Sequence, residues 1–269
     1  MIISIVQTDV VYKGKSRNID QAANLLADAD ADADIVGDMV ILPELFSTGY
    51  IFDTAQEMHE LCEQYTNSST IEALRELAEQ YDTLVVAGIA EKEADQFYNS
   101  VAVIDKNGLQ YKYRKISQTN IDKRYFTRGD SLLTFQYHDL VFGIVICFDL
   151  WFPEIIRDYA EAGVNVLLHP ANFGGEQSLH ISKVRAIENS MYVVTCNRVG
   201  EDVTKDLIGK YCGCSQICSP TGEFLAQLNS EALLKTVEIK NVNSMPKRVI
   251  GVALSDEIQC IKNQLHHGD

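Results

Sequence analysis

Residues 143–154 read GIVICFDLWFPE, in which an apolar strand pattern ends directly on a cysteine. The run before Cys147 predicts a buried strand, and Pro153 predicts the start of the following helix. Cys147 therefore occupies a strand-to-helix turn. There it is either a small core residue, the commonest role of an unpaired cysteine, or a nucleophile held at the end of a strand. This stretch alone leaves both interpretations open.

Strand and helix patterns alternate on both sides of this turn. Residues 98–115 and 214–228 predict β-hairpins that turn at residues 106–108 and 220–222. Single strands are predicted for residues 2–8, 38–44, 83–91, 140–147, 164–170 and 191–197. Helices are predicted for residues 16–29, capped by Ser16, for residues 68–81, capped by Ser69 or Thr70, and for residues 153–162 and 178–190. Hairpins mixed with crossover helices predict an α/β fold with mixed, partly parallel sheets.

The composition is typical of a globular protein made of one domain. The 5 prolines and 16 glycines are scattered as isolated turn signals, so we find no linker and expect one domain over residues 1–269. No apolar run approaches the ~20 residues that a membrane span requires. The N-terminal stretch MIISIVQTDV predicts a strand rather than a signal peptide, and 7 cysteines without regular spacing do not indicate a disulfide framework. We therefore expect a cytoplasmic protein.

The charge excludes two classes of partner. A formal charge of −15 argues against nucleic acids and anionic membranes, which both require a basic surface. Part of this charge lies in residues 27–38, ADADADADIVGD, which invites a calcium-binding interpretation. An EF-hand loop needs glycine at its sixth position and glutamate at its twelfth, and neither Asp28 nor Asp32 begins a loop that meets both requirements. We interpret the stretch as a solvated helix end.

Three predicted strands end on residues that could take part in chemistry, namely Glu44, Lys115 and Cys147. Each has a structural explanation by itself, since a glutamate can cap a helix and a lysine can extend to solvent. Together they supply the roles for acyl transfer from an amide. A thiol attacks only as the thiolate, which requires a base such as Glu44. The oxyanion that forms requires donors, such as the Lys115 ammonium and the Phe148 backbone N–H.

With these motifs in this order, the chain resembles the nitrilase superfamily of carbon–nitrogen hydrolases. The resemblance rests on LPELFSTGY around Glu44, YRKI around Lys115 and CFDLWFPE around Cys147, with weaker similarity in VRAIEN, CNRVG and SPTGE. It implies a four-layer α-β-β-α sandwich, usually assembled as a homodimer or larger oligomer. The resemblance extends to about residue 240, and the tail from about residue 241 diverges.

The resemblance assigns roles to further residues. Members of the family often carry a second glutamate that orients the lysine, and the matching residue in DKRYFTRGD is Asp122, which is one methylene shorter. The alternative is a surface or capping aspartate. Phe148, Trp151, Tyr50 and Asn172 are the residues that we expect to bind the substrate or the oxyanion. No metal and no organic cofactor is implied.

By resemblance, the reaction is hydrolysis of a non-peptide C–N bond in a small amide or N-carbamoyl compound. It proceeds through a cysteine thioester and releases ammonia or an amine. Members that act on dicarboxylate half-amides often carry an arginine at the position of Trp151. The CNRVG motif of this chain, however, also occurs in such members. Half-amides and nitriles are therefore alternative substrates, and acyl transfer to an amine is an alternative reaction. The non-enzymatic alternative is a catalytically silent binding protein of the same fold.

Two other groups of residues have structural interpretations. Cys212, Cys214 and Cys218 suggest metal ligands, but zinc sites usually have paired cysteines and a fourth ligand elsewhere. On a strand these three residues would share one face, so we expect small buried thiols that pack in a sheet. Arg185 and Glu188 predict a structural ion pair rather than a pair of catalytic groups.

Overall fold

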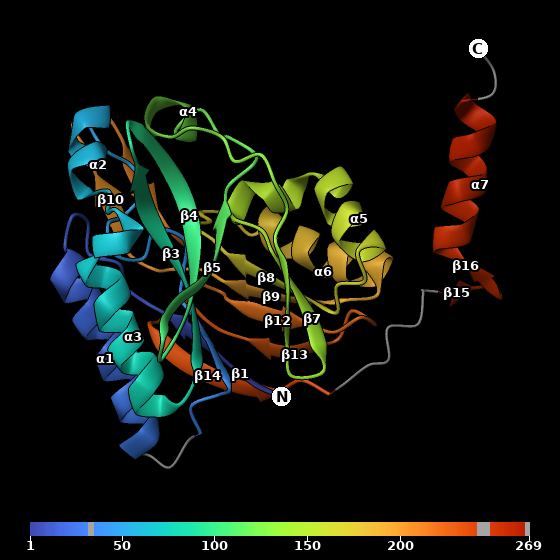
Figure 1. The fold of residues 1–269 in the computed structure, drawn as a ribbon, viewed down its shortest axis with the longest axis horizontal. Coiled ribbons are helices and arrows are strands. Elements are labelled where there is room, and N and C mark those ends of the chain that lie inside the picture. The colour runs from blue at the N-terminus through green and yellow to red at the C-terminus, as the bar shows by residue number, and fades with distance from the viewer. Residues whose placement is uncertain (32–34, 241–247, 267–269) are drawn as a thin grey trace.

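The computed structural model describes residues 1–31, 35–240 and 248–266, and it contains two six-stranded sheets that face each other (Figure 1). In spatial order the first sheet comprises β14 (Leu233–Glu238), β1 (Ile2–Gln7), β2 (Met39–Ile41), β3 (Leu84–Glu93), β4 (Gln96–Asp105) and β5 (Gly108–Arg114). The second comprises β13 (Phe224–Gln227), β12 (Gln216–Cys218), β9 (Tyr192–Cys196), β8 (Val166–Pro170), β7 (Leu140–Ile144) and β6 (Thr134–Tyr137). Strands β1, β2 and β3 are parallel, as are β7, β8 and β9, and all other neighbours in the two sheets are antiparallel. The prediction of mixed sheets is confirmed.

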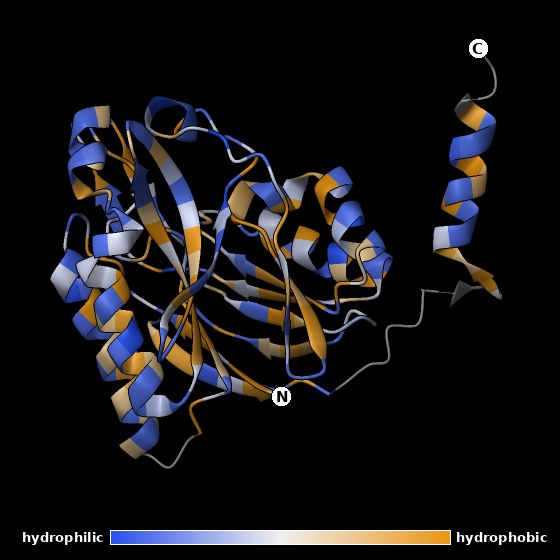
Figure 2. Cartoon of the chain, viewed as in Figure 1, coloured by the Kyte–Doolittle hydropathy of each residue, from blue (hydrophilic) through white to orange (hydrophobic). Residues whose placement is uncertain are grey.

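Helices cover the outer face of each sheet and complete four layers. Helices α1 (Lys15–Ala31) and α3 (Ser69–Tyr81) lie on the first sheet, and α5 (Pro153–Glu161) and α6 (Gln177–Asn189) lie on the second. Apolar side chains fill the space between the sheets and between each sheet and its helices. Figure 2 shows these hydrophobic residues along the strands. Since the central parallel strands are buried on both faces, they need apolar residues on both sides. The predicted four-layer α-β-β-α sandwich is confirmed.

The remaining elements are short, apart from the C-terminal helix. They are α2 (Ala55–Leu61), α4 (Asp122–Tyr125), the 3₁₀ helices η1 (Tyr65–Asn67) and η2 (Cys147–Trp151), β10 (Glu201–Val203), β11 (Ile208–Lys210), β15 (Arg248–Val249), β16 (Val252–Ala253) and α7 (Leu254–His266). Figure 1 shows α7 apart from the two sheets, and Lys262 Nζ on this helix lies 3.4 Å from Glu161 Oε1. No helix in the described part of the chain is both long and apolar enough to span a membrane. The domain boundaries and the divergent tail stay predictions, and residues 241–247 lie outside the described residues.

The predicted N-caps of two helices were wrong. Helix α1 begins before Ser16, because the Gly14 carbonyl already accepts the first helical hydrogen bond, from Asn18 N–H at 2.9 Å. Helix α3 is capped by Ser68 rather than by Ser69 or Thr70, since the Ser68 hydroxyl accepts from Ile71 N–H at 3.0 Å. At α3 the three adjacent hydroxyl residues 68–70 leave the choice of cap open in the sequence.

The acidic stretch agrees with a solvated helix end as far as the structure describes it. Asp28 and Asp30 are exposed in the last turns of α1. Asp32 and Asp34 lie outside the described residues.

Candidate active site

Glu44 follows β2 and is held against the neighbouring strand β3. Gly88 N–H donates to the Pro43 carbonyl at 3.1 Å, and Phe46 N–H donates to the Gly88 carbonyl at 3.0 Å. A Cβ atom at Gly88 would lie 2.5 Å from the Glu44 Cα atom, so only glycine permits this approach. Contact between two backbones therefore fixes the position of Glu44.

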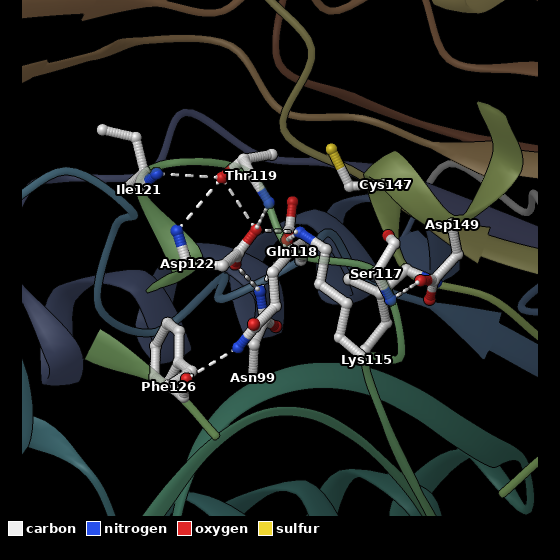
Figure 3. Close-up of polar contacts among 12 residues, drawn as sticks. Asn99, Lys115, Ser117, Gln118, Thr119, Ile121, Asp122, Phe126, Cys147 and Asp149 are labelled. Atoms are coloured by element: carbon white, nitrogen blue, oxygen red, sulfur yellow. Dashed lines mark hydrogen bonds and ion pairs between the residues drawn. The ribbon is translucent and has the colours of Figure 1, made fainter. Parts of the chain in front are cut away.

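Lys115 directly follows β5, and its Nζ atom lies between two buried carboxylates. Nζ donates to Glu44 Oε1 at 2.8 Å and to Asp122 Oδ2 at 3.0 Å. Asn99 on β4 bridges the same carboxylates, because its Nδ2 atom donates to Glu44 Oε1 at 2.7 Å and to Asp122 Oδ1 at 3.2 Å. Figure 3 shows Lys115 extending from its strand toward Asp122, with the Cys147 side chain nearby. The three predicted charged residues are thus brought together, each at most 2% exposed.

Asp122 is fully buried, which excludes the surface interpretation. Besides Lys115, its Oδ2 atom accepts hydrogen bonds from Thr119 N–H at 2.9 Å and from the Tyr50 hydroxyl at 3.1 Å. The centroid of the Tyr50 ring also lies 5.5 Å from Lys115 Nζ. Tyr50, which we expected to bind the substrate or the oxyanion, therefore contacts the Lys115–Asp122 pair.

The burial of this cluster sets its protonation. Burial raises the pKa of Glu44, and the Lys115 ammonium offsets that effect only in part. Burial also raises the pKa of the Cys147 thiol well above its usual value, and the charge of Glu44 adds to the increase. For Lys115, burial would lower the pKa, but Asp122 and Glu44 outweigh it and hold the pKa well above its usual value. The resting site thus combines a lysine ammonium with a neutral thiol and a glutamate of increased proton affinity.

Cys147 begins η2 with a φ angle of +45°, in the left-handed region that residues other than glycine rarely adopt. Asp149 supports this turn, because its carboxylate accepts hydrogen bonds from Ile146 N–H at 3.0 Å and from Ser117 N–H at 2.7 Å. Ser117 lies two residues after Lys115, and Figure 3 shows the bond to Asp149. Asp149 therefore ties the turn of the cysteine to the segment that carries the lysine.

Arg185 of α6 holds the other end of the same turn. Its guanidinium donates to the Leu150 carbonyl at 3.0 Å and to the Trp151 carbonyl at 3.1 Å. The predicted ion pair with Glu188 is present, with 2.7 Å between Nη1 and Oε1. The pair is structural, and it supports the strand-to-helix turn.

The other three residues that we expected to bind the substrate or the oxyanion are Phe148, Trp151 and Asn172, and they follow Cys147 in the sequence. The N–H of Phe148 stands at the open N-terminal end of η2, whose first backbone hydrogen bond runs from Asp149 N–H to the Ile146 carbonyl at 2.9 Å. Trp151 is 38% exposed, and its Nε1 atom donates to Ser178 Oγ at 3.2 Å. Asn172 follows β8, and its backbone N–H faces the Cys147 thiol. The roles of these residues in binding stay predictions.

A model of the carbon–nitrogen hydrolase family matches residues 2–246. The chain belongs to the carbon–nitrogen hydrolase family. The hydrolase is 37% identical over 227 residues to a nitrilase of Pyrococcus abyssi. The matched region covers 83% of each of the two chains. It is 31% identical over 244 residues to 2-oxoglutaramate amidase of Bacillus subtilis, across 88% of this chain and 90% of that protein. An amidase from Nesterenkonia sp. shares the fold, with a TM-score of 0.80 and 20% identity over 98% of this chain and 96% of that one.

These similarities confirm the predicted superfamily and the reaction class. The protein is a hydrolase that acts on carbon–nitrogen bonds. The family match extends over both sheets and both pairs of covering helices, so it includes every segment that contributes to the candidate site.

Sequence reasoning missed three contributors to the candidate site of the hydrolase. Asn99 carries no local signal, because its partners Glu44 and Asp122 are distant in the sequence and meet it only in the folded sheet. Thr119 had a local signal, because it bonds to Asp122 only three residues later. Asp149 also had a signal. It lies two residues after Cys147 in a predicted apolar environment, and a buried carboxylate requires hydrogen-bond donors around it.

The three clustered cysteines of the hydrolase do not share one strand face, so this prediction was wrong. Gly213 and Cys214 have left-handed φ angles of +65° and +57°, which interrupt the extended chain before β12. Only Cys218 is fully buried in the sheet, whereas Cys212 and Cys214 are half-buried beside the core. Within the described residues, no group of three or more histidine, cysteine or acidic side chains could hold a metal ion.

Proposed function

We propose that Cys147 is the nucleophile of this hydrolase, with Glu44 as general base and Lys115 as the fixed positive charge beside the oxyanion. The observation that carries the proposal is the buried Lys115 ammonium, which pairs with both Glu44 and Asp122 next to the thiol. One cation between two carboxylates leaves a net negative charge. Uptake of one proton by Glu44 would neutralise the cluster, and this favours a base at that position.

Acylation begins when Glu44 takes the thiol proton and Cys147 Sγ attacks the carbonyl carbon of the substrate. Glu44 Oε2 suits this role, because it is buried and has no hydrogen-bond partner among the described residues. The electron pair of the carbonyl moves onto its oxygen, where the Lys115 ammonium and the Phe148 N–H stabilise the charge. Glu44 then passes the proton to the leaving nitrogen. The C–N bond breaks, and a thioester remains on Cys147.

Deacylation reverses the roles of the same groups. Glu44, again a carboxylate, takes a proton from water, and the hydroxide attacks the thioester carbon. The C–S bond breaks, the proton returns to the thiolate, and the acid leaves. General acid–base assistance of this kind contributes about 10²–10⁴-fold to the rate. Asp122 would keep the ammonium in place during both steps.

The proposed substrate is a small amide or an N-carbamoyl compound. The side-chain amide of Asn172 supports this class, because it is 7% exposed and neither of its polar atoms has a partner among the described residues. A buried polar group without a partner costs about 1–3 kcal/mol. An amide or ureide offers both a donor and an acceptor, which would satisfy the two atoms of Asn172 together.

Dicarboxylate half-amides and nitriles are the alternative substrates. The relatives favour neither, since one is a nitrilase and another is a 2-oxoglutaramate amidase. A panel of aliphatic amides, N-carbamoyl amines, half-amides and nitriles tests the proposal, with ammonia release as the readout and Cys147→Ala as the control. Turnover restricted to amides and ureides supports it. Turnover of nitriles alone would replace the substrate class, and normal turnover by Cys147→Ala would remove the nucleophile.

We also infer that the hydrolase works in the cytoplasm as a homodimer or larger homo-oligomer. The inference rests on the family resemblance and on the seven cysteines, all of which are free. Light scattering after size-exclusion chromatography tests the assembly, and a monomer at micromolar concentration would contradict it.

A further inference from the structure

His169 is a buried histidine that none of the proposed catalytic steps uses. It lies on β8 and is fully buried. Its Nε2 atom lies 3.0 Å from the Cys147 carbonyl oxygen, and its Nδ1 atom lies 3.0 Å from Thr195 Oγ1 on β9. Both ring nitrogens have a partner, and one partner belongs to the proposed nucleophile.

These partners fix the hydrogen positions of the ring. A carbonyl oxygen only accepts hydrogen bonds, so Nε2 of His169 carries a hydrogen. Burial lowers the pKa of His169 to about 4, so the ring is neutral at physiological pH and Nδ1 is an acceptor. Thr195 must therefore donate to Nδ1, and its oxygen accepts from Ser182 Oγ, 3.0 Å away. Every hydrogen in this series points toward the Cys147 carbonyl.

The Cys147 carbonyl belongs to the same peptide group as the N–H of Phe148, the proposed oxyanion donor. This peptide bond is trans and planar, so its C=O and N–H point in opposite directions. A hydrogen bond that holds the carbonyl on one side also sets the direction of the N–H on the other. A donor on the carbonyl further polarises the peptide group, which strengthens the N–H as a donor.

This peptide group needs support from outside the turn. A left-handed conformation such as that of Cys147 costs about 1–2 kcal/mol in residues other than glycine. Asp149 fixes the N–H of Ile146 before the cysteine, and Arg185 fixes two carbonyls after it. His169 holds the carbonyl between these two supports.

We propose that His169 is a positioning residue for the oxyanion donor: its Nε2–H orients and polarises the Cys147–Phe148 peptide group so that the Phe148 N–H points at the oxyanion. The inference rests on the proposed role of Cys147 as nucleophile. The effect falls on the tetrahedral transition state. It leaves binding of the uncharged amide and the reactivity of the thiol itself largely unchanged.

Two variants with opposite expectations test this role. His169→Leu removes the donor, whereas His169→Gln keeps an amide N–H that reaches the position of Nε2. Loss of one oxyanion donor lowers kcat by about 10²–10³-fold, so misdirecting it in His169→Leu should lower kcat by about 10²-fold with an almost unchanged KM. His169→Gln should recover most of that loss. Alkylation of Cys147 by iodoacetamide displaces iodide and develops no oxyanion, so its rate should stay near the wild-type rate in both variants.

Three results would overturn the inference. The first is a wild-type kcat in His169→Leu. The second is an equal loss of kcat and of alkylation rate without recovery in His169→Gln, because that pattern describes a residue that merely keeps the thiol in place. The third applies even if His169→Leu fails to fold, since nitrogen NMR of the wild-type imidazoles reports which ring nitrogen is protonated. A proton on Nδ1 overturns the inference, and a proton on Nε2 supports it.

The same assays separate this inference from the proposed function. Normal hydrolysis by Cys147→Ala would remove the nucleophile and with it the basis of both. An inactive Cys147→Ala combined with a fully active His169→Leu would remove only the role of His169.

Discussion

Replacing Asp122 by asparagine tests how the lysine of the site is held. Burial alone would raise the pKa of Asp122, but the Lys115 ammonium and the donors of Thr119 hold it below the usual value, so the group is charged at neutral pH. Asparagine keeps the shape and removes the charge. Whichever way the new amide is oriented, its NH₂ group faces a donor, either Lys115 Nζ on one side or Asn99 Nδ2 on the other.

The structure gives the size of the effect. A buried hydrogen bond to a charged group contributes about 1.5–3 kcal/mol. If that loss falls on the transition state, kcat decreases by about 10- to 100-fold. We therefore expect Asp122→Asn to lower kcat by about tenfold or more. Asp122→Glu should also be impaired, because another methylene would crowd this fully buried site.

Ammonia release at several substrate concentrations, together with thermal unfolding, measures both variants. Glu91→Gln is the matched control, since Glu91 is a buried carboxylate on β3 that pairs with Lys112 and Arg114. It should lose stability and keep its kcat. Wild-type kcat in both Asp122 variants would refute the reasoning, because it would mean that Lys115 is positioned without this carboxylate.

Three further predictions concern other residues of the site. Lys115→Arg should fail nearly as badly as Lys115→Ala in ammonia release, because a planar guanidinium cannot replace a compact ammonium between Glu44 and Asp122; retained activity would contradict this geometry. In the pH profile of kcat/KM, the midpoint of the acid limb should lie above the usual pKa of a glutamate, because Glu44 must be ionised to accept a proton and burial raises its pKa. A midpoint at or below that usual pKa would exclude Glu44 as the base. Arg185→Met should lower the free energy of unfolding by about 2–4 kcal/mol in a denaturant titration, since two carbonyls of the turn lose a charged donor; an unchanged value would mean that the turn is held without it.

Much of the candidate site could be predicted because its key residues lie in local motifs. Each of the three stands at the end of a predicted strand: Glu44 follows β2 and Lys115 follows β5 in the first sheet, and Cys147 follows β7 in the second. Their proximity depends in addition on how the two sheets face each other, which the local motifs do not encode. Asp122 was also placed correctly beside the lysine by resemblance, although its length differs from that of the glutamate in related chains.

The rest of the site depends on contacts that no local pattern encodes. Asn99 bridges two carboxylates only because β4 lies between β3 and β5 in the sheet. The prediction for Cys212 and Cys214 was wrong because two successive left-handed residues interrupt the chain, and periodicity alone does not reveal such a break. The N-cap of α3 was wrong because three adjacent hydroxyl residues satisfy the same sequence rule.

The most direct test of the account is the site of acylation. Enzyme mixed with a reactive amide substrate and quenched in acid within the first turnover is digested, and the peptides are examined by mass spectrometry. The account predicts the mass of the substrate acyl group on the peptide that contains Cys147, with loss of both adduct and ammonia release in Cys147→Ala. An acyl group on Cys196 or on any other residue, or normal ammonia release by Cys147→Ala, would contradict it.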